Sequence, residues 1–144
     1  MAYKNTLQVY ELLEKFEKTK SRKEKIEVLR SYPHMALKDV LRGIFDDRVQ
    51  WNLPGGEPPY SASSDESTPS TLLKQHLKFK YLVRGIPTSD ELPSVRREKI
   101  FLDMLETVHA GDAKVLVSMI NKQSPVKGLT KKIVQEAYPD LIPD

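Results

Sequence analysis

The chain has 144 residues, of which 39% are hydrophobic and 30% are charged, and it carries a formal net charge of +3 with no cysteine. This composition is typical of a soluble globular domain, and the lack of cysteine excludes disulfides, Cys-based zinc sites and thiol catalysis. No apolar run approaches the roughly 20 residues of a membrane-spanning helix, and no signal peptide opens the chain, so we expect a cytoplasmic protein without membrane contact.

The first predicted helix begins near residue 7. Asn5 or Thr6 is expected to cap it, because both side chains can accept a hydrogen bond from a free helix N–H group. Its apolar residues follow the spacing i, i+3, i+4, i+7, which puts them on one helical face: Val9, Leu12, Leu13 and Phe16.

A proline separates the second predicted helix from the third. Ser21 and Glu24 have the spacing of a capping box, so the second helix is expected to begin there and to end before Pro33. The third helix follows Pro33 and repeats the apolar spacing at Leu37, Val40, Leu41 and Ile44.

Residues 52–70 are rich in proline, glycine and serine and show no apolar period. A segment of this length is either a functional loop or a flexible connector. We do not expect a domain boundary here, because each half of the chain would form only a marginal core by itself. Trp51, the only tryptophan, is expected to anchor this loop on the helices, with base stacking as the alternative.

The second half of the chain predicts about four more helices. Pro93 is expected at the opening of one helix, with Gly111 at its end and Asp112 as the cap of the next. The apolar spacing recurs in both, at Phe101, Met104, Leu105 and Val108 and at Ala113, Leu116, Val117 and Ile120. No stretch alternates as a strand would, so we predict an all-α fold of six to seven helices in a single domain over residues 1–144.

We find no recognisable catalytic or metal-binding pattern. His34, His76 and His109 have neither HxxxH nor HExxH spacing, so solvated or helix-terminal roles are expected for them. The stretch "LPGGEPPY" matches neither of the glycine patterns that bind phosphates. The sequence therefore predicts a protein with no enzymatic activity, cofactor, metal ion or small-molecule substrate.

The C-terminal stretch places lysines where a helix begins. Gly128 allows the backbone to turn freely, and a short helix is expected from Thr130. Lys127, Lys131 and Lys132 crowd the N-terminal end of that helix, where cations are mildly unfavourable. Either these lysines belong to an ordinary solvated surface, or they and the free N–H groups of the helix bind an anion such as phosphate.

Two further basic clusters are candidates for the same surface. Lys20, Arg22 and Lys23 lie at the start of the second helix, and Arg96 and Arg97 lie in a later one. Clustered cations on a nearly balanced chain are an electrostatic sign of nucleic-acid binding. If either of these clusters shares a face with the C-terminal lysines, nucleic-acid binding is favoured; if the clusters point in unrelated directions, a protein-interaction role is favoured.

The C-terminal motif runs from Gly128 through a short helix containing Ile133 and Val134 to Tyr138–Pro139 and a final "LIP". With the order of the predicted elements, it resembles the N-terminal, all-helical DNA-binding domain of ATP-dependent DNA ligases, particularly those of tailed phages. The resemblance spans nearly the whole chain. It implies that the protein grips duplex DNA through the backbone across the minor groove, with the helix after Gly128 approaching a phosphate. The Lys-x-Asp-Gly motif that carries AMP in ligases is missing, so ligation is not expected.

The stretches "DAKVL" and "KGLTKKIVQEAYP" are also similar to those of small stand-alone proteins from T-even-like phages, including phages of marine cyanobacteria. We therefore expect a non-catalytic phage protein that binds duplex DNA in the infected host cell without strong sequence preference. The alternative is a protein-interaction adaptor or virion component on the same helical scaffold, which binds a phage or host protein and no nucleic acid.

Overall fold

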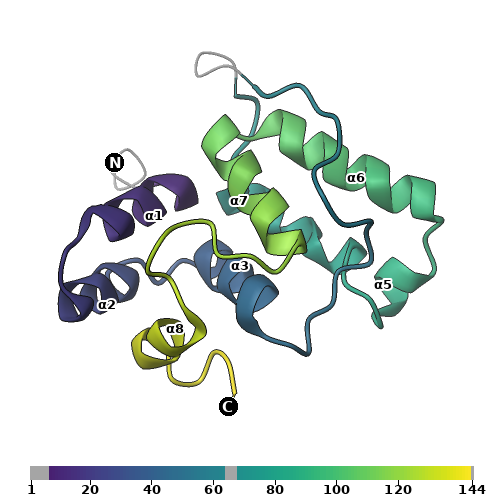
Figure 1. The fold of residues 1–144 in the computed structure, drawn as a ribbon. Coiled ribbons are helices and arrows are strands. Elements are labelled where there is room, and N and C mark those ends of the chain that lie inside the picture. The colour runs from purple at the N-terminus through teal and green to yellow at the C-terminus, as the bar shows by residue number, and fades with distance from the viewer. Residues whose placement is uncertain (1–6, 64–67, 144) are drawn as a thin grey trace.

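The prediction of an all-α fold is confirmed. The computed structural model describes residues 7–63 and 68–143, and helices make up the regular structure of these ranges apart from two isolated β-bridges (Figure 1). The elements are α1 (Val9–Lys18), α2 (Arg22–Arg30), α3 (Met35–Phe45), α4 (Leu72–Gln75), the 3-10 helix η2 (His76–Tyr81), α5 (Pro87–Asp90), α6 (Ser94–Thr107), α7 (Ala110–Ile120) and α8 (Lys131–Ala137). The described ranges hold more helices than the six to seven predicted, because α4 and α5 are single turns too short to show an apolar period.

Polar side chains form hydrogen bonds with backbone N–H groups at the start of each of the first two helices. Glu11 accepts a hydrogen bond from the backbone N–H of Gln8 at 2.9 Å, which fixes the start of α1. The predicted caps Asn5 and Thr6 lie outside the described residues. Ser21 accepts a hydrogen bond from the N–H of Glu24 at 3.1 Å, so the predicted start of α2 is confirmed.

The junction between α6 and α7 differs from the prediction. α6 ends at Thr107, and His109 caps α7 by accepting the N–H of Gly111 on its Nδ1 atom at 2.9 Å. Asp112, predicted to be the cap, is instead buried in the first turn of α7. There its Oδ1 atom accepts the N–H of Tyr10 at 2.9 Å and so joins α7 to α1. A histidine as N-cap is uncommon, and the aspartate three residues later misled the boundary prediction.

The hydrophobic core joins residues from both sides of the long loop. α1 and α3 each pack against α7, and α2 packs against α8, so the first and last parts of the chain share their apolar faces. Phe16, Leu41, Leu105, Leu116 and Val134 are all fully buried in this one cluster. Each such side chain stabilises the fold by roughly 1.5–3 kcal/mol through burial. Figure 1 shows α2 and α8 at one end of the molecule and α5 and α6 at the other.

The loop that follows α3 is fastened to the helices along its described part. Trp51 is buried, and its Nε1–H donates to the carbonyl of Gly43 at 3.0 Å, so the predicted anchoring role is confirmed. Asn121 makes hydrogen bonds to both the N–H and the carbonyl of Gly56, at 2.7 Å and 3.0 Å. Near the end of the loop, the N–H of Ser70 donates to a carbonyl at the end of α6. The described part of the loop is therefore fixed on the helices and is not a flexible connector.

Candidate nucleic-acid interface

Two basic segments come together at one end of the molecule. Residues 15–30 and 126–137 contain ten lysines or arginines and four glutamates, a net charge of +6, compared with +3 for the whole chain. They form the end of α1, all of α2 and all of α8, and α2 packs directly on α8. The fold thus gathers at one end (Figure 1) the positive charge that the sequence shows as separate clusters.

The segment before α8 lies against the turn between α1 and α2. The N–H of Lys127 donates to the Oε2 atom of Glu17 at 3.0 Å. Gly128 has a φ of +84°, and a Cβ atom at that position would lie 3.6 Å from the Nζ atom of Lys25. Lys25 in turn donates to the carbonyl of Phe16 at 2.8 Å and closes the C-terminal end of α1. Lys127 and Gly128 therefore lie beside the turn that carries Lys20, although 110 residues separate Glu17 from Lys127.

The start of α8 is more closed than the sequence indicates. Thr130 uses its Oγ1 atom to accept the N–H of Ile133 at 3.3 Å, and Glu17 already accepts the N–H of Lys127. α8 is also only seven residues long, so its dipole is small. The amide-lined anion site predicted around Gly128 and Thr130 is therefore partly occupied by the protein's own side chains, Glu17 and Thr130. What this corner offers to an anion is its lysine side chains.

Arg22 contributes to packing more than to free charge. Its guanidinium group forms an ion pair with the carboxylate of Glu136 on α8. Close by, Arg30 donates to the carbonyl oxygens of Glu136 at 3.0 Å and Ala137 at 3.4 Å, at the C-terminal end of α8. An exposed ion pair such as that of Arg22 and Glu136 stabilises the fold by less than about 1 kcal/mol. Together the two arginines set the orientation of α8 on α2, and the charge of Arg22 is already compensated.

Arg96 and Arg97 do not belong to this surface. Both lie on α6, at the end of the molecule opposite α2 and α8 (Figure 1). The guanidinium group of Arg97 donates to the carbonyl oxygens of Asn52 and Ser89, each at 3.0 Å, and to that of Leu92. Arg97 thus ties the loop and α5 to α6. The sequence could not separate these arginines from the other cluster, because their distance from it depends on the tertiary fold.

Besides Lys15 and Lys18 of α1, five lysines remain at the α2–α8 end, and we call these five the basic surface: Lys20, Lys23, Lys127, Lys131 and Lys132. Four are exposed and Lys131 is half-buried. In residues 7–63 and 68–143, none of their ammonium groups has an ion-pair or hydrogen-bond partner. Their charge is therefore free to act on a ligand.

The three histidines have structural roles. His34 accepts the N–H of Ala36 at 3.0 Å on Nδ1, and His109 caps α7, so helix-terminal roles are confirmed for both. Burial lowers the pKa of His34, and the neighbouring His76 lowers it further. His76 also lies at a helix end, because it follows α4 and begins η2, and it is buried there with its Nδ1 atom 2.7 Å from the Oδ2 atom of Asp39. The described part of the chain contains no group of three His, Asp or Glu side chains arranged to hold a metal ion.

Sequence reasoning misses two residues that shape the interface, Glu17 and Lys25. Glu17 is one acid among several on a helix surface, and Lys25 is one lysine of a basic cluster. Their partners, the N–H of Lys127 and the carbonyls at the end of α1, become neighbours only when the helices pack. No local pattern carries that information.

Within the described residues, no helix combines the length and the apolar character that crossing a membrane requires. A comparison with curated protein sequences finds no match. A model of a family of unknown function, DUF6433, matches residues 12–125, from the middle of α1 to the loop that follows α7. α8 lies outside the matched range. Because the match covers more than three quarters of the 144 residues, the chain belongs to the DUF6433 family.

Proposed function

We propose that the protein binds duplex DNA through its sugar–phosphate backbone, without strong sequence preference and without catalysis. The observation that carries the proposal is the basic surface itself. Five lysines with no partner among the described residues lie on two packed segments that are distant in the sequence. Lysine acts on phosphates as a flexible point charge, which suits contact with a backbone and carries no information on base sequence.

The energetics of such an interface come from counterion release. Each lysine that neutralises a phosphate releases condensed cations, so binding weakens as the salt concentration rises. If three to five lysines make contacts, the logarithm of the affinity falls with the logarithm of salt with a slope of roughly −3 to −5. Binding is then modest at physiological salt and strong at low salt.

The resemblance to the DNA-binding domain of phage ligases supports the same proposal. The residues that carry it include Gly128 and the helix that follows, and the structure has these beside the α1–α2 turn. The same resemblance supports a phage protein that acts in the cytoplasm of the infected cell. It also supports duplex DNA over other polyanions.

The test is a titration of labelled duplex DNA, intact and nicked, at low and moderate salt. Reversal of charge at Lys127, Lys131 and Lys132 to Glu is expected to weaken binding of every duplex alike and to reduce the salt slope by about 3. The matched control reverses Lys74, Lys78 and Lys114, which are exposed on other elements, and changes the net charge by the same amount. No binding at low salt, salt-independent binding or an equal loss in the control contradicts the proposal.

A second candidate is an adaptor or virion component that binds a protein and no nucleic acid. The observation that favours it is the mixture of charges at the α2–α8 end. Arg22 is paired with Glu136, and Glu17 lies against the backbone of Lys127, so acids interrupt the basic surface. This candidate predicts a complex with a phage or host protein that survives both nuclease and high salt.

A further inference from the structure

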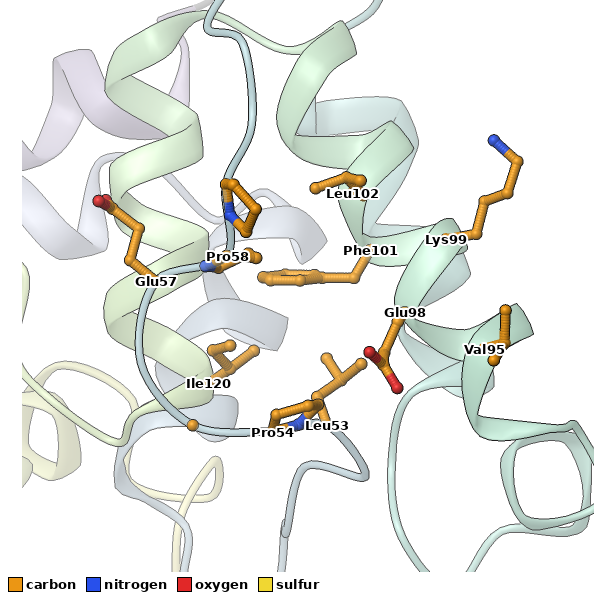
Figure 2. Close-up of a pocket in the computed structure, with 12 residues that line it drawn as sticks. Leu53, Pro54, Glu57, Pro58, Val95, Glu98, Lys99, Phe101, Leu102 and Ile120 are labelled. Carbon is orange, nitrogen blue, oxygen red and sulfur yellow. The ribbon is translucent and has the colours of Figure 1, made fainter.

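An apolar pocket of about 500 Å³ lies between the long loop and α6, away from the basic surface (Figures 1 and 2). Its walls are mainly carbon, contributed by Leu53, Pro54 and Pro58 of the loop, Phe101 and Leu102 of α6, and Ile120 at the end of α7. Figure 2 shows the ring of Phe101 extending toward Pro58 across the pocket. Pockets of this size and character are typical of ligand and peptide sites in proteins.

The loop wall of this pocket is held in place by hydrogen bonds. Arg97 binds the carbonyl of Asn52 at one end, and Asn121 binds both backbone groups of Gly56 in the middle. Further along, Glu106 of α6 accepts the N–H of Ser61 at 3.0 Å. Prolines between these points restrict the backbone further. A partner therefore meets a preformed surface and does not have to order the loop on binding.

One carboxylate faces this apolar pocket without a cation. Figure 2 shows the side chain of Glu98 turned toward Leu53 and Pro54, whereas that of Glu57 points away. In the described ranges Glu98 has no ion-pair or hydrogen-bond partner. Of its basic neighbours, Arg97 binds backbone carbonyls. Lys99 also lines the pocket, but it lies 3.4 Å from Asp103 and extends away from Glu98 (Figure 2). The pocket thus combines apolar walls with one uncompensated negative charge.

The apolar surface continues beyond the pocket onto the exposed side of α6. Val95 lines the pocket and is 76% exposed, one of the most exposed large apolar side chains in the described part of the chain. A small molecule held in the pocket would leave much of this side chain in water. A polypeptide that crosses the pocket would cover it.

From these features we propose that the pocket docks a segment of a partner protein that inserts large apolar side chains and places a lysine or arginine beside Glu98. The proposal does not rest on DNA binding, because the pocket and the basic surface lie at different ends of the molecule (Figure 1). A protein with both sites connects a basic, apolar peptide at one end with a polyanion at the other.

The test begins with selection of displayed random peptides on the full-length protein. The expected consensus holds two large apolar residues and a neighbouring Lys or Arg. A synthetic consensus peptide is then titrated against variants at exposed positions, which do not disturb folding. Glu98→Gln is expected to weaken binding by about three- to tenfold, and Val95→Asp is expected to weaken it as well. The matched control Glu14→Gln, on the exposed side of α1, leaves binding unchanged.

The decisive arm exchanges the charges. Glu98→Lys is expected to lose the basic peptide and to gain affinity for the same peptide with Glu in place of its Lys or Arg. Consensus peptides without a basic residue overturn the proposal, and so does binding to Glu98→Gln and Val95→Asp that is as tight as binding to the wild-type protein. Binding of a small aromatic amine such as phenethylamine in the pocket, when no peptide is selected, overturns it in favour of a small-molecule site.

Discussion

The ammonium group of Lys122 donates to the carbonyl oxygen of Gly43 at 2.9 Å and to that of Asp46 at 2.8 Å. These carbonyls form the C-terminal end of α3, so a lysine that follows α7 closes a helix from the other half of the chain. Lys122 has a φ of +55°, a conformation that side-chain-bearing residues rarely adopt. The hydrogen bonds to α3 compensate for that strain.

Lys122→Met is therefore expected to lower the free energy of unfolding by about 1–3 kcal/mol, because two helix carbonyls lose a charged donor in a half-buried place and keep only the N–H groups of Trp51 and Val49. Lys114→Met, which removes an exposed lysine from α7 itself, is the control and should have almost no effect. Urea unfolding measures the stability of both variants. The fluorescence of Trp51 reports on it, because the indole N–H of Trp51 donates to the same Gly43 carbonyl as Lys122. Equal effects of the two substitutions would contradict the capping role of Lys122.

Asp112 makes stability depend on pH. Burial is the main reason that the pKa of this carboxyl rises from 3.8 to about 6, and the hydrogen bond from Tyr10 offsets only part of that effect. The folded state keeps the proton up to about pH 6, whereas the unfolded state loses it near pH 4. The contribution of Asp112 to stability is therefore largest below about pH 4, declines as the pH rises to 6 and stays low above.

A comparison with Asp112→Asn isolates this contribution, because the amide does not titrate. Between pH 4 and pH 7, the unfolding free energy of the wild-type protein is expected to fall by about 2–3 kcal/mol relative to that of the variant. Denaturant titrations at several pH values measure it. A difference that is constant across this range would show that the pKa of Asp112 is not raised.

Gly128 is expected to position the basic surface. Its φ of +84° strains any other residue, so Gly128→Ala should cost about 1 kcal/mol of stability. Gly85 has a φ of +91° with nothing nearby, so Gly85→Ala is the matched control with a similar cost. Only the substitution at Gly128 should also weaken DNA binding, because it displaces Lys127 and the start of α8. If the two variants bind DNA with equal affinity, Gly128 does not position the basic surface.

Arg96 and Arg97 are adjacent in the sequence, but only Arg97 is expected to contribute to stability. Arg97→Met is expected to reduce the free energy of unfolding by about 2 kcal/mol or more, since three carbonyl oxygens lose a charged donor. Arg96→Met removes the same charge from an exposed position and should leave stability unchanged. Thermal unfolding measures both. The two variants should bind DNA with equal affinity. A loss of DNA affinity in only one of them would show that α6 contributes to the interface.

The periodic parts of the fold could be predicted from the sequence, and the short or irregular parts could not. Apolar spacing identified the helices around Phe16, Leu41, Met104 and Leu116, because a repeated pattern over two turns has few alternative explanations. α4, η2 and α5 were missed as separate elements, since four to six residues cannot display a period. The cap of α7 was misassigned because His109 acted where Asp112 was expected.

The candidate interface was only partly predictable. The lysines and the turn at Gly128 follow from local chemistry, and the sequence indicated them correctly as neighbours of a helix start. The engagement of Arg22 with Glu136, and of Arg97 with the loop, depends on contacts between segments far apart in the chain. Local patterns identify where charges are, whereas the fold determines which charges remain free.

The packing of α8 on α2 has a consequence for synthesis of the protein. Tyr138, at the end of α8, donates through its hydroxyl group to the carbonyls of Leu29 and Tyr32, and the apolar side of α2 faces the same helix. During translation, α2 is made before α8 and acquires this cover only after residues 131–137 have left the ribosome. The side of α2 around Leu29 that faces α8 therefore stays exposed while the residues between the two helices are made, a period in which chaperones and proteases have access to it.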